Sequence, residues 1–151
     1  ADDITVLAVE YRGKAAGESL RREFPCESAS LAASAAFLEE ALDDAGCPPR
    51  AKMQLLTALD EIASNVVRCS GATAFAVDVR LGDAPRGAWV EVSDDGRAFD
   101  PFSLPPPDTT LPPERRKAGG LGIHLVRKTM DEVTYRRVLG HNVVAFRKAF
   151  G

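Results

Sequence analysis

Cysteine and histidine, the side chains that form disulfides and most transition-metal sites, are scarce in this sequence. The 151 residues include three cysteines, Cys26, Cys47 and Cys69, and two histidines, His124 and His141. No pair of cysteines has the C-x-x-C spacing that zinc ligands commonly show. We therefore expect reduced thiols in a cytoplasmic protein, without a zinc site or a disulfide framework.

Long apolar runs and an excess of basic residues are also missing. No segment has the roughly 18 consecutive apolar residues that a membrane-spanning helix needs. The formal net charge is −3, so the chain has no basic surplus to place against nucleic acid or an anionic membrane. With 45% hydrophobic and 27% charged residues, the composition is typical of one soluble globular domain with a core.

The spacing of the apolar residues predicts three helices and several strands. Apolar residues recur at helical spacing over residues 29–45, where Ser28 is a candidate N-cap, over residues 50–68 and over residues 122–132. Alternating or β-branched segments predict strands at residues 4–11, 20–24, 74–81, 88–94, 133–138 and 142–150. This mixture predicts an α+β fold, a two-layer α/β sandwich whose mixed, mostly antiparallel sheet is covered on one face by helices.

A carboxylate and an amide lie one turn apart in the second predicted helix. Glu61 and Asn65 are four residues apart, which places both side chains on one side of the helix, next to its apolar stripe. Oxygen ligands suit magnesium, which commonly keeps waters and substrate phosphates as its other ligands. Arg68 lies on the same side and could meet a phosphate. The same pattern also fits an ordinary solvated helix edge.

A second polar group ends the strand predicted at residues 88–94. Asp94 has the parity of Val90 and Val92, so its side chain is expected on the helix-covered side of the sheet. A buried carboxylate needs a partner, and the exocyclic amine of a purine would supply one. Gly96 would let the backbone approach a flat ring. A tight turn with no ligand is the alternative.

Three glycines fall within four residues just before the third predicted helix. The segment consists of Gly119, Gly120, Leu121 and Gly122, and it follows a loop over residues 103–117 that is rich in proline and charge. Glycines at a helix start leave backbone N–H groups open, and the helix dipole favours an anion there. The segment therefore predicts a phosphate contact through a lid. A hinge that only lets the loop pack tightly is the alternative.

Taken in chain order, these segments resemble a known nucleotide-binding family. The motifs that carry the resemblance are DEIASN at residues 60–65, DDGRAFDP at 94–101, GGLGIHLVRKTMDEVTY at 119–135 and NVVAFRK at 142–148. Residues 20–150 are similar to the GHKL (Bergerat-fold) ATPases, and specifically to the anti-sigma-factor serine kinases. The first three motifs match the N box and the two glycine boxes of that family. The resemblance implies its histidine-kinase-like ATPase fold.

The resemblance also implies a role for each candidate residue, with ATP and magnesium as cofactors. Glu61 would be the general base for a serine hydroxyl, Asn65 the magnesium ligand and Asp94 the reader of the adenine amine. Further contacts with the nucleotide would come from Arg68, Gly96, Phe99, Gly119, Gly120, Leu121 and Gly122. The sequence departs from the family at Cys69, because many relatives carry a histidine soon after the N box. This departure concerns contacts near the phosphates and not the magnesium ligand.

The implied function is an ATP- and magnesium-dependent protein serine kinase of a bacterial partner-switching system. Its substrate would be an anti-sigma-factor antagonist of the STAS type; it could also sequester a sigma factor, and the resemblance allows a homodimer. A non-catalytic ATP-sensing module that regulates an attached serine phosphatase is the alternative. A histidine kinase is disfavoured because no helical hairpin carries a phosphoacceptor histidine. No direct contact with nucleic acid or with a membrane is expected.

The first residues carry a second resemblance. DDITVLAVEYRG at residues 2–13 is similar to the last strand of the metal-dependent serine phosphatases, where a carboxylate of the aspartate pair helps to hold catalytic metal. We therefore expect residues 1–12 to be a remnant strand of an upstream phosphatase domain, 13–19 a linker, and 20–151 the ATP-binding kinase domain of a longer protein. An ordinary acidic terminus leading into a strand is the alternative.

Overall fold

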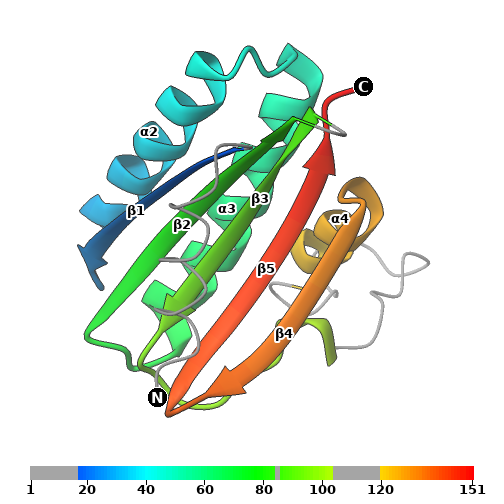
Figure 1. Ribbon diagram of the computed structural model, residues 1–151. Helices are drawn as coiled ribbons and strands as arrows, with labels where there is room; N and C mark the ends of the chain where they lie inside the picture. Colours follow the sequence, from blue (N-terminus) through cyan, green and yellow to red (C-terminus); the bar gives the residue numbers. More distant parts are fainter. Residues whose placement is uncertain (1–16, 84–85, 104–119) are drawn as a thin grey trace.

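The computed structural model describes residues 17–83, 86–103 and 120–151 of the chain. The elements in chain order are β1 (Gly17–Pro25), α2 (Ala29–Asp44), α3 (Pro49–Cys69), β2 (Ala74–Asp83), β3 (Arg86–Asp94), the 3-10 helix η1 (Pro101–Ser103), α4 (Gly120–Thr129), β4 (Glu132–Val138) and β5 (His141–Ala149). Figure 1 shows the helices layered on one face of a twisted sheet. The predicted α+β sandwich is therefore confirmed.

The strands of the described residues form one sheet in the order β1-β2-β3-β5-β4. Every pairing in this part of the chain is antiparallel, so the sheet predicted to be mixed has no parallel pair there. The sequence predicts the edge strand β1 only from residue 20, whereas Gly17 already pairs with Gly82. Residues 17–19 of the predicted linker therefore belong to the sheet. The strand predicted at residues 4–11 lies outside the described residues.

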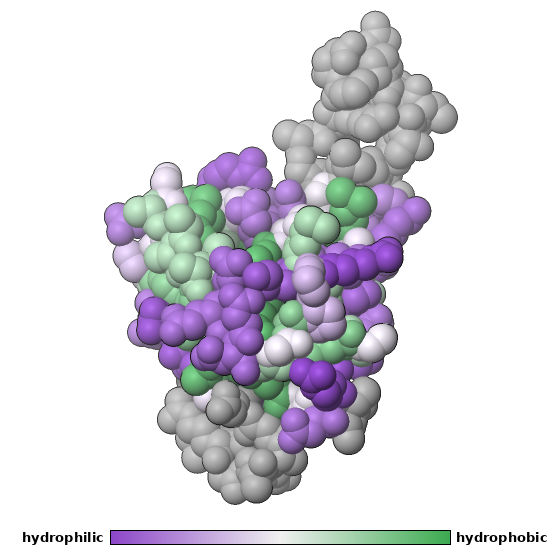
Figure 2. All heavy atoms as spheres, turned by 90° about the horizontal axis from the view of Figure 1, so that it is seen from above, coloured by the Kyte–Doolittle hydropathy of each residue, from purple (hydrophilic) through white to green (hydrophobic). Residues whose placement is uncertain are grey.

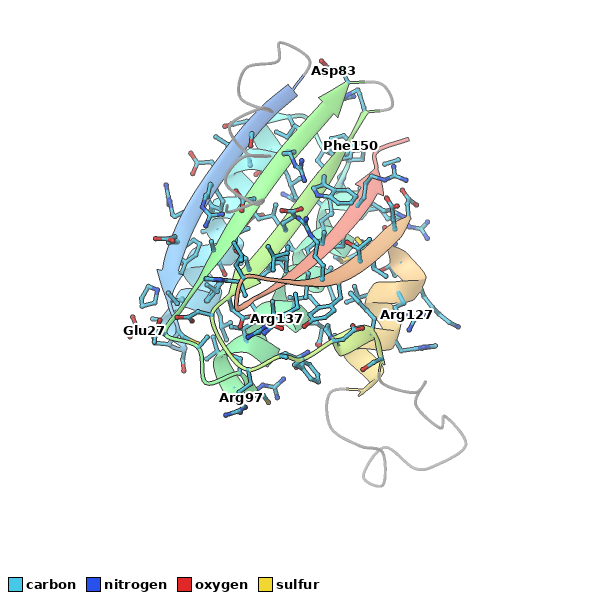
Figure 3. All side chains as sticks on the ribbon, turned by 60° about the horizontal axis from the view of Figure 1, so that its bottom comes forward. Glu27, Asp83, Arg97, Arg127, Arg137 and Phe150 are labelled. Atoms are coloured by element: carbon cyan, nitrogen blue, oxygen red, sulfur yellow. The ribbon has the colours of Figure 1, made fainter. Side chains whose placement is uncertain are left out.

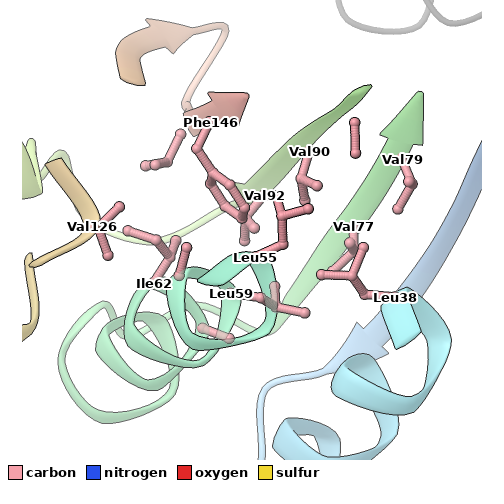
Figure 4. Close-up of a cluster of buried hydrophobic side chains, with 14 of the residues drawn as sticks. Leu38, Leu55, Leu59, Ile62, Val77, Val79, Val90, Val92, Val126 and Phe146 are labelled. Atoms are coloured by element: carbon pink, nitrogen blue, oxygen red, sulfur yellow. The ribbon is translucent and has the colours of Figure 1, made fainter. Parts of the chain in front are cut away.

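The core lies between the sheet and the helices. Side chains of alternating parity on β2, β3 and β5 face the helices and are fully buried, among them Val77, Val79, Val90, Val92 and Phe146. In Figure 4 these side chains meet apolar residues of the helices, among them Leu38, Leu55, Leu59 and Ile62. The strand parity predicted from the sequence is confirmed. Asp94 shares this parity, so its carboxylate is buried on the same side of the sheet.

Helices α2 and α3 begin and end at local signals that the sequence shows. Gly46 follows α2 with φ +71, a conformation that favours glycine, and Pro49 occupies the first turn of α3. Ser28 lies at the N-cap of α2 as predicted, but its side chain makes no capping hydrogen bond and its backbone is already helical. The hydroxyl of Ser30 instead donates to the carbonyl oxygen of Pro25 at 2.6 Å.

Helix α4 is displaced from the predicted range of 122–132. It ends at Thr129, and Glu132 already belongs to β4. The backbone amide of Asp131 donates to the carbonyl oxygen of Arg147 on β5 at 2.9 Å, so pairing with the sheet ends the helix early. The side chains predicted to point inward from α4 are buried, namely Ile123, Val126 and Met130.

Polar and apolar residues are interspersed on the face seen in Figure 2. None of the described helices combines the length and the apolar character that a bilayer crossing requires. The loop predicted at residues 103–117 lies outside the described residues except for Ser103, which ends η1, and Gly119 lies outside them as well.

Candidate functional site

A cavity of about 200 Å³ opens between the C-terminal half of α3, the loop after β3 and the start of β5. Its apolar lining comes from Ile62, Val66, Ala98, Phe99, Pro101 and Val144. Its polar lining includes Asn65, Asp94, Arg97 and Asn142. The structure therefore brings three predicted site residues, Asn65, Asp94 and Phe99, to one cavity. An apolar cleft with a few convergent polar groups is the usual form of a small-molecule site.

Asp94 presents a carboxylate oxygen that is available to a ligand. The residue is only 4% exposed. Its Oδ1 accepts hydrogen bonds from the amide of Gly96 at 2.8 Å and from Asn142 Nδ2 at 3.1 Å. Its Oδ2 accepts none from the described residues. A donor entering the cavity, such as an amine on a flat ring, can therefore pair with Oδ2 while Oδ1 stays held.

Asn142 holds this carboxylate in place, and the sequence interpretation missed it. The side chain is buried and uses both ends of its amide: Nδ2 also donates to the carbonyl oxygen of Arg97 at 2.7 Å, and Oδ1 accepts from the amide of Phe99 at 3.1 Å and the hydroxyl of Tyr135 at 2.7 Å. Asn142 has the parity of the buried Val144 and Phe146. The signal in the sequence was a polar residue at a strand position whose alternation predicts burial.

Gly96 is required for a contact that differs from the predicted one. A Cβ at this position would lie 2.6 Å from the carbonyl oxygen of Ser70 and 2.7 Å from its Cβ, closer than such atoms approach in proteins. The next amide, that of Arg97, donates to the same carbonyl oxygen at 2.9 Å. Glycine therefore lets the loop after β3 lie on the end of α3. The predicted approach of a ring to Gly96 stays a prediction.

Two arginines fix the loop that forms the cavity wall (Figure 3). Arg97 Nη2 donates to the carbonyl oxygen of Cys69 at the end of α3, and Arg137 Nη1 donates to the carbonyl oxygen of Gly96 at 2.8 Å. Phe99, which the loop carries, is 43% exposed at the cavity. Cys69, where many relatives carry a histidine, is exposed and also lines the cavity.

Glu61 lies one turn before Asn65 on α3 and faces the first turn of α4. A Cβ at Gly122 would overlap the Oε2 and Cδ atoms of Glu61, so the carboxylate lies directly against the backbone of that glycine. Burial raises the pKa of the Glu61 carboxyl, the neighbouring carboxylate of Asp60 raises it further, and Arg68 opposes the rise. The structure thus brings Glu61 of the predicted Glu61–Asn65 pair together with Gly122 of the glycine segment. A partly desolvated carboxylate with a raised pKa suits a general base.

Asn65 and Arg68 lie side by side at the rim of the site. Arg68 Nη2 is 3.4 Å from Asn65 Oδ1, a long hydrogen bond, and Arg68 Nε donates to the carbonyl oxygen of Ser64 at 3.2 Å. The described residues contain no group of three or more His, Cys, Asp or Glu side chains that could hold a metal ion. An ion at this rim would need most of its ligands from phosphate and water. That donor set fits magnesium.

The glycine segment is only partly described. Gly120, Leu121 and Gly122 form the first turn of α4, so their backbone N–H groups belong to a helix N-terminus, which favours an anion. Arg127 Nη1 on the same helix donates to the carbonyl oxygen of Phe102 in η1 at 2.8 Å. This bond ties α4 to the segment that follows the cavity loop. Contacts of these glycines with phosphate stay a prediction.

A sequence comparison with protein families decides the assignment. The profile of the histidine kinase-like ATPase domain matches residues 24–148 of this chain. The chain belongs to the histidine kinase-like ATPase domain family. Membership implies ATP binding, and it confirms the resemblance to the GHKL ATPases. No curated protein matches the sequence.

Solved structures agree with this fold. The crystal structure of the RsbU and RsbW domains of Rv1364c from Mycobacterium tuberculosis has a TM-score of 0.64 and 15% identity, over 87% of this chain and 32% of that one. The Acinetobacter baumannii histidine kinase AdeS has a TM-score of 0.50 and 12% identity, over 98% of this chain and 75% of that one. The chain spans about a third of the length of the first of these relatives. At such low identity the likeness concerns the fold.

Proposed function

We propose that this histidine kinase-like ATPase domain is an ATP- and magnesium-dependent protein serine kinase. The observation that carries the proposal is the position of Glu61. Its partly buried carboxylate makes no hydrogen bond or ion pair with any described residue. It lies one helical turn from Asn65, which lines the same cavity as the open carboxylate oxygen of Asp94. The proposed base and metal ligand therefore lie one turn apart on α3, and the proposed ring-recognition group at the end of β3 faces the cavity that Asn65 lines.

Each residue has a defined task in this proposal. Asp94 Oδ2 accepts a hydrogen bond from the adenine amine, and Asn65 Oδ1 would hold magnesium, which would neutralise phosphate charge. Glu61 accepts the proton of the serine hydroxyl as the serine oxygen bonds to the terminal phosphorus of ATP; the bond from that phosphorus to the bridging oxygen breaks, and ADP leaves. Phosphoryl transfer depends mainly on positioning and charge neutralisation. A few well-placed side chains on α3 and at the end of β3 can therefore provide the chemistry.

The proposed substrate is a STAS-type antagonist of an anti-sigma factor in a partner-switching system. Sequestration of a sigma factor, a homodimer and an upstream phosphatase domain whose last strand would be residues 1–12 belong to the same proposal. The likeness to a mycobacterial structure that contains RsbU and RsbW domains supports it. The motifs that resemble the anti-sigma-factor serine kinases support it as well.

Transfer of labelled phosphate from ATP to a serine of an antagonist domain tests the proposal. Glu61→Gln keeps the shape of the side chain but removes the proton acceptor, so we expect transfer to fall by about 10²–10⁴ while ATP affinity changes little. Glu40→Gln is the control, because Glu40 is an exposed glutamate on α2 that does not line the cavity, and it should leave transfer unchanged. Equal rates for wild type and Glu61→Gln would contradict the role of base.

The alternative is a non-catalytic ATP-sensing module of an attached phosphatase. In that case the wild-type protein binds ATP but transfers no phosphate to any antagonist domain. Calorimetric measurement of ATP binding beside the transfer assay distinguishes the two functions. ATP binding that changes the activity of an attached phosphatase, without transfer, would favour the sensing module.

A further inference from the structure

The contact between Glu61 and Gly122 leaves no room for a side chain at position 122. A Cβ there would overlap Oε2 and Cδ of Glu61 and would lie 2.6 Å from Oε1. Atoms of this kind essentially never approach within 3.0 Å of each other. The whole carboxylate group therefore occupies the space in which any other residue would begin its side chain. Every substitution of Gly122 has to displace either the carboxylate or the helix.

No hydrogen bond or ion pair with a described residue fixes the Glu61 carboxylate. It has no hydrogen-bond donor among the described residues, whereas Asp94 is held by two donors. Arg68, the nearby cation on the same helix, donates instead to Ser64 and Asn65. The backbone of α4 at Gly122, against which the carboxylate lies, therefore restricts the position of this side chain.

Helix α4, in contrast, is anchored firmly against α3. Ile123, the residue after the glycine, is 3% exposed and Val126 is 1% exposed. Figure 4 shows Val126 close to Ile62, the neighbour of Glu61 in sequence. Because buried side chains hold the helix in place, a new Cβ at position 122 would displace the flexible, unbonded carboxylate more easily than the helix.

We propose that Gly122 is a positioning residue: its missing side chain lets the first turn of α4 support the Glu61 carboxylate at the place where it takes the serine proton. This inference rests on the proposed function. It assigns Gly122 a task that differs from an anion contact through backbone N–H groups. The helix itself does not require the glycine, because alanine is the better helix former at such a position.

Gly122→Ala tests the inference by separating nucleotide binding from chemistry. We expect ATP affinity to stay within about threefold of wild type. Transfer should fall by about 10²-fold, the loss that a displacement of about 1 Å causes in a catalytic group. Lys128→Ala, an exposed change on the same helix, is the control and should leave both quantities unchanged. A loss of ATP affinity equal to the loss of transfer would show a phosphate contact instead and overturn the inference.

Two further variants connect the effect to Glu61. In a Glu61→Gln background the base is already absent, so Gly122→Ala should lower the remaining transfer by no more than about twofold if both act through one group. Glu61→Asp is one methylene shorter and ends before the space at position 122, so Gly122→Ala should cost little in that background as well. A full additional loss in both backgrounds would contradict the proposal.

A measurement without any substrate protein keeps this inference separate from the kinase proposal. Carboxyl NMR titration reports the pKa of Glu61, which burial raises in wild type while Asp60 and Arg68 act in opposite directions. Gly122→Ala should move the carboxylate into solvent and return its pKa toward the ordinary value. If the protein transfers no phosphate but this change occurs, the kinase proposal fails and the positioning contact holds. An unchanged pKa in a folded Gly122→Ala protein would overturn the contact itself.

Discussion

Replacement of Asn142 by aspartate tests whether this side chain orients the carboxylate of Asp94. Asn142 Nδ2 donates to Asp94 Oδ1 at 3.1 Å and to the carbonyl oxygen of Arg97 at 2.7 Å. Asn142→Asp keeps the shape of the side chain and the oxygen that accepts from Phe99 and Tyr135. It replaces the donor by an oxygen, so two carboxylates would face each other in a buried position.

The size of the effect follows from the distance and from the pH. Two unit charges at this separation repel by about 5 kcal/mol at an effective dielectric constant of about 20. One carboxyl can avoid the repulsion by binding a proton, which costs about 1.4 kcal/mol for each pH unit above its usual pKa of about 4. We therefore expect the repulsion to lower the free energy of unfolding by about 5 kcal/mol at pH 8 and by about 1.5 kcal/mol at pH 5.

The stability of Asn142→Asp should fall as the pH rises. The shared proton raises the folded-state pKa of the pair above its unfolded value, so the stability of Asn142→Asp is retained at low pH and lost as the pH rises. Asn142→Ala is the uncharged control. It leaves buried groups without partners at a cost of about 2–4 kcal/mol, which should be the same at both pH values.

Urea unfolding of wild type and both variants at pH 5 and pH 8 measures these differences. Asn142→Asp should be less stable than Asn142→Ala at pH 8 and at least as stable at pH 5, each relative to wild type. If the loss in Asn142→Asp were the same at both pH values, the two side chains would not face each other. The role of Asn142 in holding Asp94 would then be wrong.

Three other predictions concern the site directly. Asp94→Ala should weaken ATP binding by at least about tenfold in calorimetric titration, whereas Asp95→Ala, which removes an exposed carboxylate bonded to Thr73, should bind ATP as wild type does. The pKa of Glu61 is raised, and a base acts only when it is deprotonated. Transfer should therefore fall as the pH drops through that raised pKa, so the acid limb of the pH–rate profile should lie above the pKa of an ordinary carboxyl. An acid limb at the ordinary pKa would contradict the role of Glu61. Asn65→Ala should lose the magnesium-dependent part of ATP affinity, and an unchanged difference with and without magnesium would exclude Asn65 as the ligand.

Local periodicity predicted most of the elements. The apolar stripe of α3 placed Glu61 and Asn65 on one side of a helix, and the alternation in β3 placed Asp94 inside the sandwich. These predictions succeeded because both periodicities depend only on residues close in sequence. The boundaries were less accurate at β1 and α4, where pairing with a distant strand extends or ends the element.

Family motifs named the candidate residues, but not what each contacts. The motif predicts that Gly96 gives space to a ring, and the structure adds that a side chain there would meet Ser70. Asn142 has no local sign of its role, since a single asparagine after a turn is common. Its importance follows from the β3–β5 register, which pairs it with Asp94 across 48 residues of sequence.

The sequence by itself therefore determined the family, the two-layer architecture and the residue types available at the site. Only the tertiary structure decided that Asn142 holds Asp94, that Gly96 lies on Ser70 and that Gly122 makes room for Glu61. The physical reason is that each of these contacts joins two elements distant in sequence. Such a contact depends on strand order, strand register and helix packing, which the whole core specifies together and no local pattern encodes.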